Sequence, residues 1–249
     1  MQQPWNWLSE LMTRHYTVRK YKDEPIPEET LHQMIRAAQH AASSNFLQAY
    51  SIVHVTDVQM KQEIAELSKN PQQILTAPVF LLFCADLKRL EYACQKHGTP
   101  IRHDTVESLL VAVVDTALVA QNLALAAESM GYGICYIGGV RNNPAEISRL
   151  VNLPDKTFPL FGMTIGVPDE QHEVKPRLML EAVLHENRYD ETKYPELLDQ
   201  YDDVMARYYN QRSANRKQTN WTETVAAYFS EERRLHMRDF LASKGFLLR

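Results

Sequence analysis

DTALVAQNLALAAESMGYGICYIGGVRNN, residues Asp115–Asn143, holds the end of a long helix, a glycine that stops it, and a strand followed by paired glycines. The helix is predicted over Val106–Met130 and is apolar nearly all round, which is typical of a helix buried in a large core or between subunits. Gly131 is the type of residue expected just past a helix end. Ile134–Ile137 predicts a strand, and the two glycines behind it let the backbone approach a flat ligand.

The other elements follow from hydrophobic periodicity on either side of this stretch. Val79–Ala85 is a continuous apolar run, so that strand is expected to be buried on both faces. The remaining strands are predicted over Ser51–Val55 and Phe161–Val167, and the remaining helices up to Arg14 and over Glu28–Ala42, Asp57–Leu67, Tyr194–Asn210 and Trp221–Lys244. We therefore expect an α+β fold with helices on both faces of a mainly antiparallel, mixed sheet, because helix and strand alternate too irregularly for a doubly wound parallel sheet.

Composition limits the classes of partner. The chain has 249 residues, a formal charge of −4 and 45% apolar residues, so it can bury a sizeable core and gives no reason to expect nucleic acid. Its most apolar stretch, Ser108–Ala127, is interrupted by polar residues, and the first 14 residues do not resemble a signal peptide, so we expect a soluble protein without a membrane segment. Three cysteines without a CxxC pair predict reduced thiols and a cytoplasmic location.

Several common enzyme templates are missing from the sequence. Gly131-Tyr-Gly133 lacks the third glycine of a dinucleotide-binding GxGxxG motif, and His185-Glu-Asn lacks the second histidine of HExxH. There is neither a GxxxxGK[ST] phosphate loop nor a GxSxG nucleophile elbow. Nucleotide hydrolysis, zinc chemistry and serine hydrolase chemistry are therefore disfavoured, and we expect no metal site.

Four short clusters remain as candidate sites. Those at His15–Arg19 and Lys175–Arg177 suit a phosphate, since arginine can donate to two of its oxygens, but each is also compatible with a solvated basic segment. Tyr136–Gly139 suits a flat ligand, and the alternative is an ordinary tight turn. Ser43–Gln48 offers hydroxyls and amides, and the alternative is the capping of a helix end.

Taken in order, these clusters resemble the oxygen-insensitive, NADPH-dependent nitroreductases and flavin reductases of the FMN-containing nitroreductase superfamily. The resemblance runs from about Leu8 to the C-terminus. The matching stretches are HYTVRKYKDEPIP from His15, ASSNFLQAYSI from Ala42, FCAD at Phe83, the opening stretch from Asp115, FPLFGMTIGVP from Phe158, KPRL from Lys175 and HEN at His185.

The resemblance implies a layered α-β-α fold in an intertwined homodimer, with FMN at the interface. It implies an FMN-binding core over residues 1–190 and a helical C-terminal extension over residues 191–249 that wraps the partner. The implied FMN contacts are His15, Tyr16, Thr17, Arg19, Ser43, Ser44, Asn45, Gln73, Tyr136, Ile137, Gly138, Gly139, Lys175 and Arg177, with Ser43–Asn45 partly serving the second subunit. The implied NADPH contacts are Arg212, Arg216 and Lys217.

Two positions depart from the family pattern. Tyr16 stands where many members carry arginine or histidine. Asn70-Pro-Gln-Gln73 replaces a glutamine followed two residues later by an aromatic residue, which weakens the implied contact of Gln73 with FMN.

The reaction that the resemblance implies passes hydride from NADPH through FMN to nitroaromatics, quinones or free flavin, with ping-pong kinetics. Use of NADH is left open, and no side chain is expected to act as an acid or base, because the cofactor carries the chemistry. The alternatives are an FMN enzyme of another reaction class on the same fold, such as a dehalogenase or a flavin-destroying enzyme, a non-catalytic flavin-binding protein, and a helical dimerisation module without a ligand.

Overall fold

The computed structural model describes residues 6–212 and 217–246. The chain forms two compact units. Unit 1 comprises Met1–His172 together with Arg234–Arg249, and unit 2 comprises Glu173–Arg233. The sequence predicted a domain boundary between residues 190 and 191. The compact units instead divide between residues 172 and 173. They divide again between residues 233 and 234, because the end of the chain returns to unit 1.

Unit 1 is built on an antiparallel sheet, which in the described residues has four strands in the order β1-β2-β4-β3. The strands are β1 (Tyr50–His54), β2 (Val79–Asp86), β3 (Gly133–Ile137) and β4 (Thr157–Gly166). Ile52 pairs with Phe83, Leu82 with Gly162, and Cys135 with Thr164. Every residue of β2 is buried, as its apolar run predicts. The predicted α+β class with an antiparallel sheet is confirmed.

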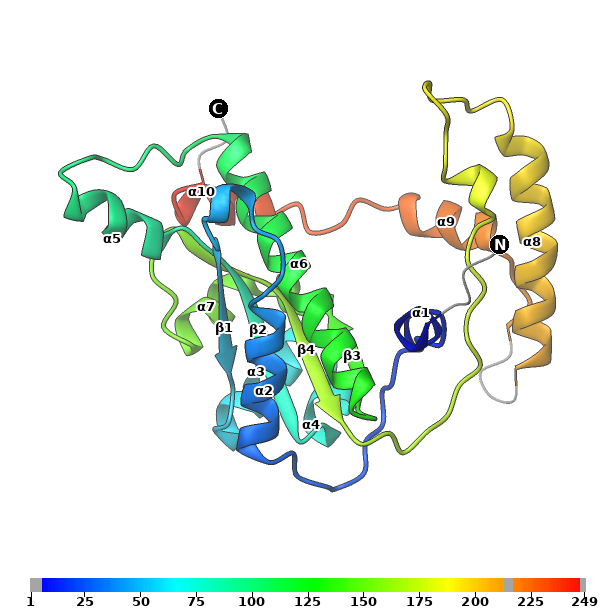
Figure 1. Ribbon diagram of the computed structural model, residues 1–249, viewed down its shortest axis with the longest axis horizontal. Helices are drawn as coiled ribbons and strands as arrows, with labels where there is room; N and C mark the ends of the chain where they lie inside the picture. The colour runs from blue at the N-terminus through cyan, green and yellow to red at the C-terminus, as the bar shows by residue number, and fades with distance from the viewer. Residues whose placement is uncertain (1–5, 213–216, 247–249) are drawn as a thin grey trace. The chain divides into compact units, whose positions relative to one another are not determined.

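Helices cover both faces of the sheet (Figure 1). One face packs against α2 (Glu28–Ala38) and α6 (Val106–Ser129) through residues such as Met34 and Leu123. The other face packs against α3 (Val58–Ser68), α4 (Pro71–Thr76) and α7 (Pro144–Leu150). The remaining elements of unit 1 are α1 (Trp7–Thr13), η1 (Ser44–Phe46), α5 (Lys88–Lys96), η2 (Gly138–Asn142) and α10 (Met237–Ser243).

Helix α6 begins at its N-cap Thr105, whose hydroxyl accepts from the Ser108 amide, and Gly131 follows its end at φ +84°. By length and composition α6 is long and apolar enough to cross a membrane, but 39% of its most apolar 18-residue stretch is buried inside the protein. Its buried side chains pack into the core of unit 1, so it is the core helix of this fold. Its exposed side carries Val106, Leu110, Val114 and Leu118, each at least 40% exposed and spaced four residues apart.

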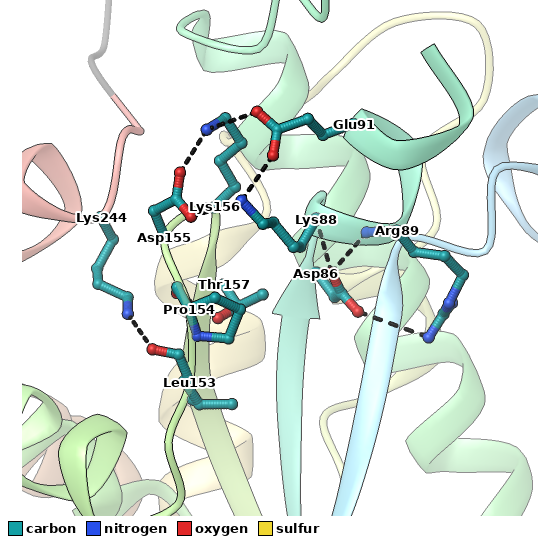
Figure 2. Close-up of polar contacts among 10 residues, drawn as sticks. All are labelled: Asp86, Lys88, Arg89, Glu91, Leu153, Pro154, Asp155, Lys156, Thr157 and Lys244. Carbon is teal, nitrogen blue, oxygen red and sulfur yellow. Dashed lines mark hydrogen bonds and ion pairs between the residues drawn. The ribbon is translucent and has the colours of Figure 1, made fainter. Parts of the chain in front are cut away.

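The C-terminal segment returns to unit 1 through aromatic packing. Phe246 is 1% exposed and meets the Phe158 ring edge-on at 5.0 Å, and Phe240 is buried in the same cluster. The Lys156 amide donates to the Lys244 carbonyl at 2.7 Å. Lys244 Nζ donates to the Leu153 carbonyl at 2.8 Å (Figure 2). Removing a buried phenyl ring typically lowers the free energy of unfolding by roughly 3–5 kcal/mol. Burial of the Phe240 and Phe246 rings therefore explains why the C-terminal segment packs into unit 1.

Unit 2 contains η3 (Leu180–Ala182), α8 (Tyr194–Gln211) and α9 (Trp221–Phe229). Its core is an aromatic cluster centred on Tyr201, Met205 and Tyr209. The predicted final helix Trp221–Lys244 is wrong as a single helix, because it is divided into α9 and α10. Arg234, between them, has φ +54°, a left-handed conformation that a continuous helix cannot contain.

Candidate functional site

The paired glycines lie where β3 ends and η2 begins. A Cβ atom at Gly139 would overlap the Asn70 side chain and the Ser68 carbonyl, so this position requires glycine. At Gly138 a Cβ atom would have no neighbour closer than 3.5 Å, so the backbone there remains approachable. The contact with Asn70 also brings the start of α4, which carries the half-buried Gln73, to the glycine turn.

The turn is fixed by polar contacts with distant segments. Arg141 Nη1 donates to the Leu160 carbonyl at 2.5 Å, beside the register shift in the pairing of β2 and β4. Arg234 Nε donates to Asn142 Oδ1 at 3.0 Å, and His236 Nε2 lies 3.0 Å from the Arg141 carbonyl. The returning C-terminal segment thus helps to hold the glycine turn, a role that sequence spacing does not indicate.

Tyr136 presents an aromatic surface beside this turn. Its side chain is 37% exposed and otherwise covered, and its ring packs edge-on against Phe161 at 5.3 Å. The Tyr136 hydroxyl lies 3.5 Å from Oε1 of Gln121 on α6. Burial, and secondarily the charge of Glu128, raises the pKa of Tyr136, so the phenol stays neutral at physiological pH. This part of the turn offers a flat apolar face with one hydroxyl donor.

The His15–Arg19 segment lies beside the other end of β3. The segment is not helical, and the Val18 amide donates to the Ile134 carbonyl at 3.0 Å. Val18 also packs directly over Gly133, where no Cβ atom would fit. The β-branched pair Thr17-Val18 favours this extended course. His15 Nδ1 lies 2.5 Å from Oε1 of Glu128 on α6.

Glu170 holds the backbone of the same segment. Its Oε1 accepts from the Arg19 amide at 2.5 Å and the Lys20 amide at 3.2 Å, and its other oxygen lies 3.1 Å from His172 Nε2. Burial would raise the pKa of Glu170, but these hydrogen bonds, with the Arg19 amide foremost, bring the pKa below its usual value. The Arg19 side chain is exposed, Thr17 is half-buried, and Tyr16 meets the His172 ring edge-on at 6.1 Å.

Ser43, Ser44 and Asn45 form a loop held by Asp115 of α6. Ser43 Oγ donates to Asp115 Oδ2 at 2.7 Å, and the Ser44 amide donates to Oδ1 at 2.9 Å. Asn45 lies at the edge of a cavity of about 620 Å³ whose wall includes Arg102 and His103. The Ser43 hydroxyl is thus engaged within the protein, whereas Asn45 faces open space.

The remaining predicted contacts lie in unit 2. Lys175 Nζ lies 5.4 Å from the centre of the Tyr209 ring, and the Arg212 guanidinium lies 5.7 Å from that of Tyr208. Arg177 Nη1 donates to the Lys175 carbonyl at 2.5 Å. Lys175 of the cluster predicted for FMN phosphate and Arg212, predicted for NADPH, therefore lie over neighbouring tyrosines near the C-terminal end of α8. Lys217 is exposed, and Arg216 lies outside the described residues.

Within unit 1, helix α6 reaches three of the predicted flavin-binding segments. Asp115 holds the Ser43–Asn45 loop, Gln121 approaches Tyr136, and Glu128 meets His15. Sequence reasoning did not assign these three residues to the site. In the sequence they are recognisable only as polar residues within an otherwise apolar helix. That pattern cannot show which loop each residue contacts.

Comparisons with known proteins identify this arrangement. The sequence model of the nitroreductase family matches residues 12–167, and that of the "Nitroreductase family, C-terminal domain" matches residues 175–249. A "CR(VI) reductase" of Pseudomonas sp. (strain G-1) is 54% identical over 239 residues, covering 96% of this chain and 98% of that protein.

Solved structures agree with the sequence matches. Bacillus megaterium NfrA2 has a TM-score of 0.95 at 34% identity, covering 98% of this chain and 100% of that one. The Vibrio harveyi NADPH:FMN oxidoreductase, solved with NAD+, has a TM-score of 0.88 at 37% identity, covering 98% and 99%. The chain belongs to the nitroreductase family. The predictions of the family, its fold and an oxidoreductase enzyme of flavin-dependent type are confirmed.

Proposed function

We propose that this enzyme binds FMN and uses it to pass hydride from NADPH to nitroaromatics, quinones, free flavin or oxidised metal anions. The observation that carries the proposal is the arrangement along β3. The His15–Arg19 segment lies beside the start of this strand and the glycine turn beside its end. Five residues of strand span about 17 Å. The arrangement suits an elongated ligand that is anionic at one end and flat at the other.

The side chains present fit FMN. The open backbone at Gly138 and the exposed ring of Tyr136 suit a flat heterocycle, and the cationic Arg19 suits a phosphate. In this proposal Lys175 and Arg177 also bind phosphate, Ser44 and Asn45 line the flavin pocket, and Ile137 and Gly139 shape its floor. When bound, FMN would accept and return hydride at its ring. The protein would orient donor and acceptor in turn at one place, which gives ping-pong kinetics.

The proposed electron donor and acceptors are inferred from the names of two relatives and from basic residues in unit 2. Arg212 with Lys217 and Arg216 would bind the 2′-phosphate that distinguishes NADPH from NADH, since arginine–phosphate pairs are strong. The Vibrio harveyi relative is called an NADPH:FMN oxidoreductase and the Pseudomonas relative a Cr(VI) reductase. Their printed names support NADPH as donor, and free flavin and chromate among the acceptors.

A homodimer completes the proposal. The exposed row Val106, Leu110, Val114 and Leu118 on α6 is a continuous apolar stripe of the kind that marks a protein interface. Pairing of two α6 helices would cover it, and loop Ser43–Asn45 would then serve the partner's flavin. The free cysteines Cys84, Cys94 and Cys135 support a cytoplasmic location.

The test is a visible spectrum of the purified protein reconstituted with FMN, recorded without oxygen. NADPH should bleach the flavin bands, and nitrofurazone or chromate, added afterwards in separate samples, should restore them. Bleaching by NADPH without recovery by either acceptor would contradict the proposed acceptors. Bound flavin that NADPH does not bleach would favour a non-catalytic flavin protein. Absence of flavin binding would overturn the proposal.

A further inference from the structure

Asp115 is a buried carboxylate that holds both ends of one loop. It is 1% exposed and lies in the middle of α6. Its Oδ1 accepts from the Ser44 amide at 2.9 Å. Its Oδ2 accepts from Ser43 Oγ at 2.7 Å and from the Ala49 amide at 3.0 Å. One side chain therefore fixes the loop where it begins and where it ends.

The loop between these two points is strained. Asn45, Phe46 and Gln48 have φ values of 46°, 59° and 53°. Residues other than glycine rarely adopt this left-handed conformation, because their Cβ atom then lies too close to the following carbonyl oxygen. Such a conformation persists only where surrounding contacts enforce it. Here the Gln48 amide donates to Ser43 Oγ at 2.7 Å, so the contact that reaches Asp115 also closes the loop internally.

The chemistry of the three donors requires a carboxylate. Two backbone amides and a hydroxyl all point at Asp115, and a carboxylate accepts from all three without donating. An asparagine of the same shape would place an NH₂ group against at least one of these donors. A buried donor left without an acceptor is costly, and the strained loop can relieve that cost by changing its conformation.

We infer that Asp115 is a positioning residue for the flavin site: it preorganises the Ser43–Gln48 loop in the shape in which Ser44 and Asn45 contact FMN. This inference rests on the proposed function. It also explains a charged residue at the centre of an apolar core helix. The loop is already ordered when the protein folds. Binding of the cofactor therefore carries no further entropic cost for ordering it.

The test compares Asp115→Asn with Asp202→Asn. Asp202 lies on α8 in unit 2 and likewise accepts from two backbone amides and a hydroxyl, those of Trp221 at 3.0 Å and Thr222 at 2.9 Å and the Thr222 Oγ1. Both variants should lower the melting temperature of the apoprotein. Only Asp115→Asn should raise the dissociation constant for FMN, about tenfold or more, and change the visible spectrum of the flavin that remains bound.

Equal FMN affinities for Asp115→Asn and the wild type, measured well below both melting temperatures, would overturn the inference. So would equal losses of affinity in Asp115→Asn and Asp202→Asn, because the effect would then be one of general stability. A failure of the wild type itself to bind FMN would overturn the proposed function instead.

Hydrogen exchange on the wild type keeps the inference testable if Asp115→Asn does not fold. The Ser44 and Ala49 amides should be protected in the apoprotein, before any FMN is added. Amides that exchange freely until FMN binds would show that the cofactor, rather than Asp115, orders the loop.

Discussion

The carboxylate of Glu128 lies 2.5 Å from Nδ1 of His15, although the two residues are 113 positions apart in the sequence. Both side chains are shielded, with 12% and 31% of their surfaces exposed respectively. A carboxylate only accepts hydrogen bonds, so the proton on this side of the ring belongs to Nδ1. Glu128 therefore fixes the orientation of the imidazole and directs Nε2 away from α6, as a carboxylate does for a histidine that binds a ligand.

Replacing Glu128 with glutamine should weaken FMN binding, because a neutral amide oxygen accepts from the histidine ring less strongly than a carboxylate does. A hydrogen bond to a charged group contributes about 1.5–3 kcal/mol, so a rise in the dissociation constant of roughly tenfold is expected. Quenching of FMN fluorescence on titration with apoprotein measures it. Glu29→Gln is the matched control, since it breaks the ion pair of Glu29 with Arg36 on the surface of α2. Unchanged affinity in Glu128→Gln would show that the charge of Glu128 does not support a cofactor contact at His15.

The two glycines after β3 should respond differently to alanine. At Gly139 the new Cβ atom would collide with Asn70 and with the Ser68 backbone, so the turn must move and the protein should lose about 1–3 kcal/mol of unfolding free energy. At Gly138 the nearest atom is 3.5 Å away, and stability should be nearly unchanged. Chemical denaturation of both apoproteins measures the difference.

The same pair separates packing from ligand contact. If FMN lies over Gly138, Gly138→Ala should lower FMN affinity while its stability stays near that of the wild type. Full stability and full FMN affinity in Gly138→Ala would place the flavin ring elsewhere. Full stability in Gly139→Ala would contradict the packing of η2 against the end of α3.

The sequence predicted those parts of the fold that depend on local pattern. Continuous burial along Val79–Ala85 and the helix stop at Gly131 were both evident from residue types, and the structure contains them. The single helix Trp221–Lys244 was wrong, because its course is decided by the burial of Phe240 and Phe246 in unit 1. Periodicity within a segment cannot show that its end packs against a core formed by residues far away.

The candidate site was likewise predictable only in the parts that depend on local residue types. The segments around His15 and Gly138 were found from residue types that suit a phosphate and a flat ring, and both lie along β3. Asp115 and Glu128 were not assigned, although each is the hydrogen-bonding partner of a predicted segment. Their roles depend on the distance between α6 and two loops, which is a property of the folded chain.

Introducing a charge on the exposed face of α6 should separate the proposed dimer. Leu110 is 52% exposed, and Leu110→Asp would place a carboxylate in the apolar contact between two helices. Sedimentation should then give the mass of one chain, 28.8 kDa, instead of two. Val58→Asp, at a valine that is 79% exposed on α3, is the control and should sediment like the wild type. A monomeric wild type would contradict the proposed homodimer.

Arg212 should distinguish the two nicotinamide donors. Arg212→Ala should raise KM for NADPH by about tenfold and leave KM for NADH nearly unchanged, because only NADPH carries the 2′-phosphate. Steady-state kinetics with each donor measures the effect. Arg207→Ala removes an exposed arginine from the same helix end and should change neither value. Equal small changes for both donors in Arg212→Ala would contradict the assignment.

Four charged side chains form a ring close to the C-terminal segment that carries Lys244 (Figure 2). Lys88 Nζ lies 2.7 Å from both Glu91 and Asp155, and Lys156 Nζ lies 2.9 Å and 2.5 Å from the same two acids. Hydrogen bonds from Lys156 and then Lys88 lower the pKa of Asp155 to about 2, from an ordinary value of 3.8. The pKa of Glu91 is lowered by Lys88 and Lys156 as well.

Because the pKa of Asp155 is lower in the folded than in the unfolded protein, its ionised form stabilises the fold above pH 3.8, and this contribution is lost as the pH falls toward 2. Asp155→Asn should therefore reduce stability at pH 7, by less than about 1 kcal/mol since the group is half exposed, and the deficit should shrink by pH 3. Urea denaturation of both proteins at the two pH values measures it. At pH 7, 0.5 M NaCl should also reduce the deficit, to roughly half or less, because salt screens exposed charges. A deficit that grows on acidification would mean that Asp155 acts through packing and not through its charge.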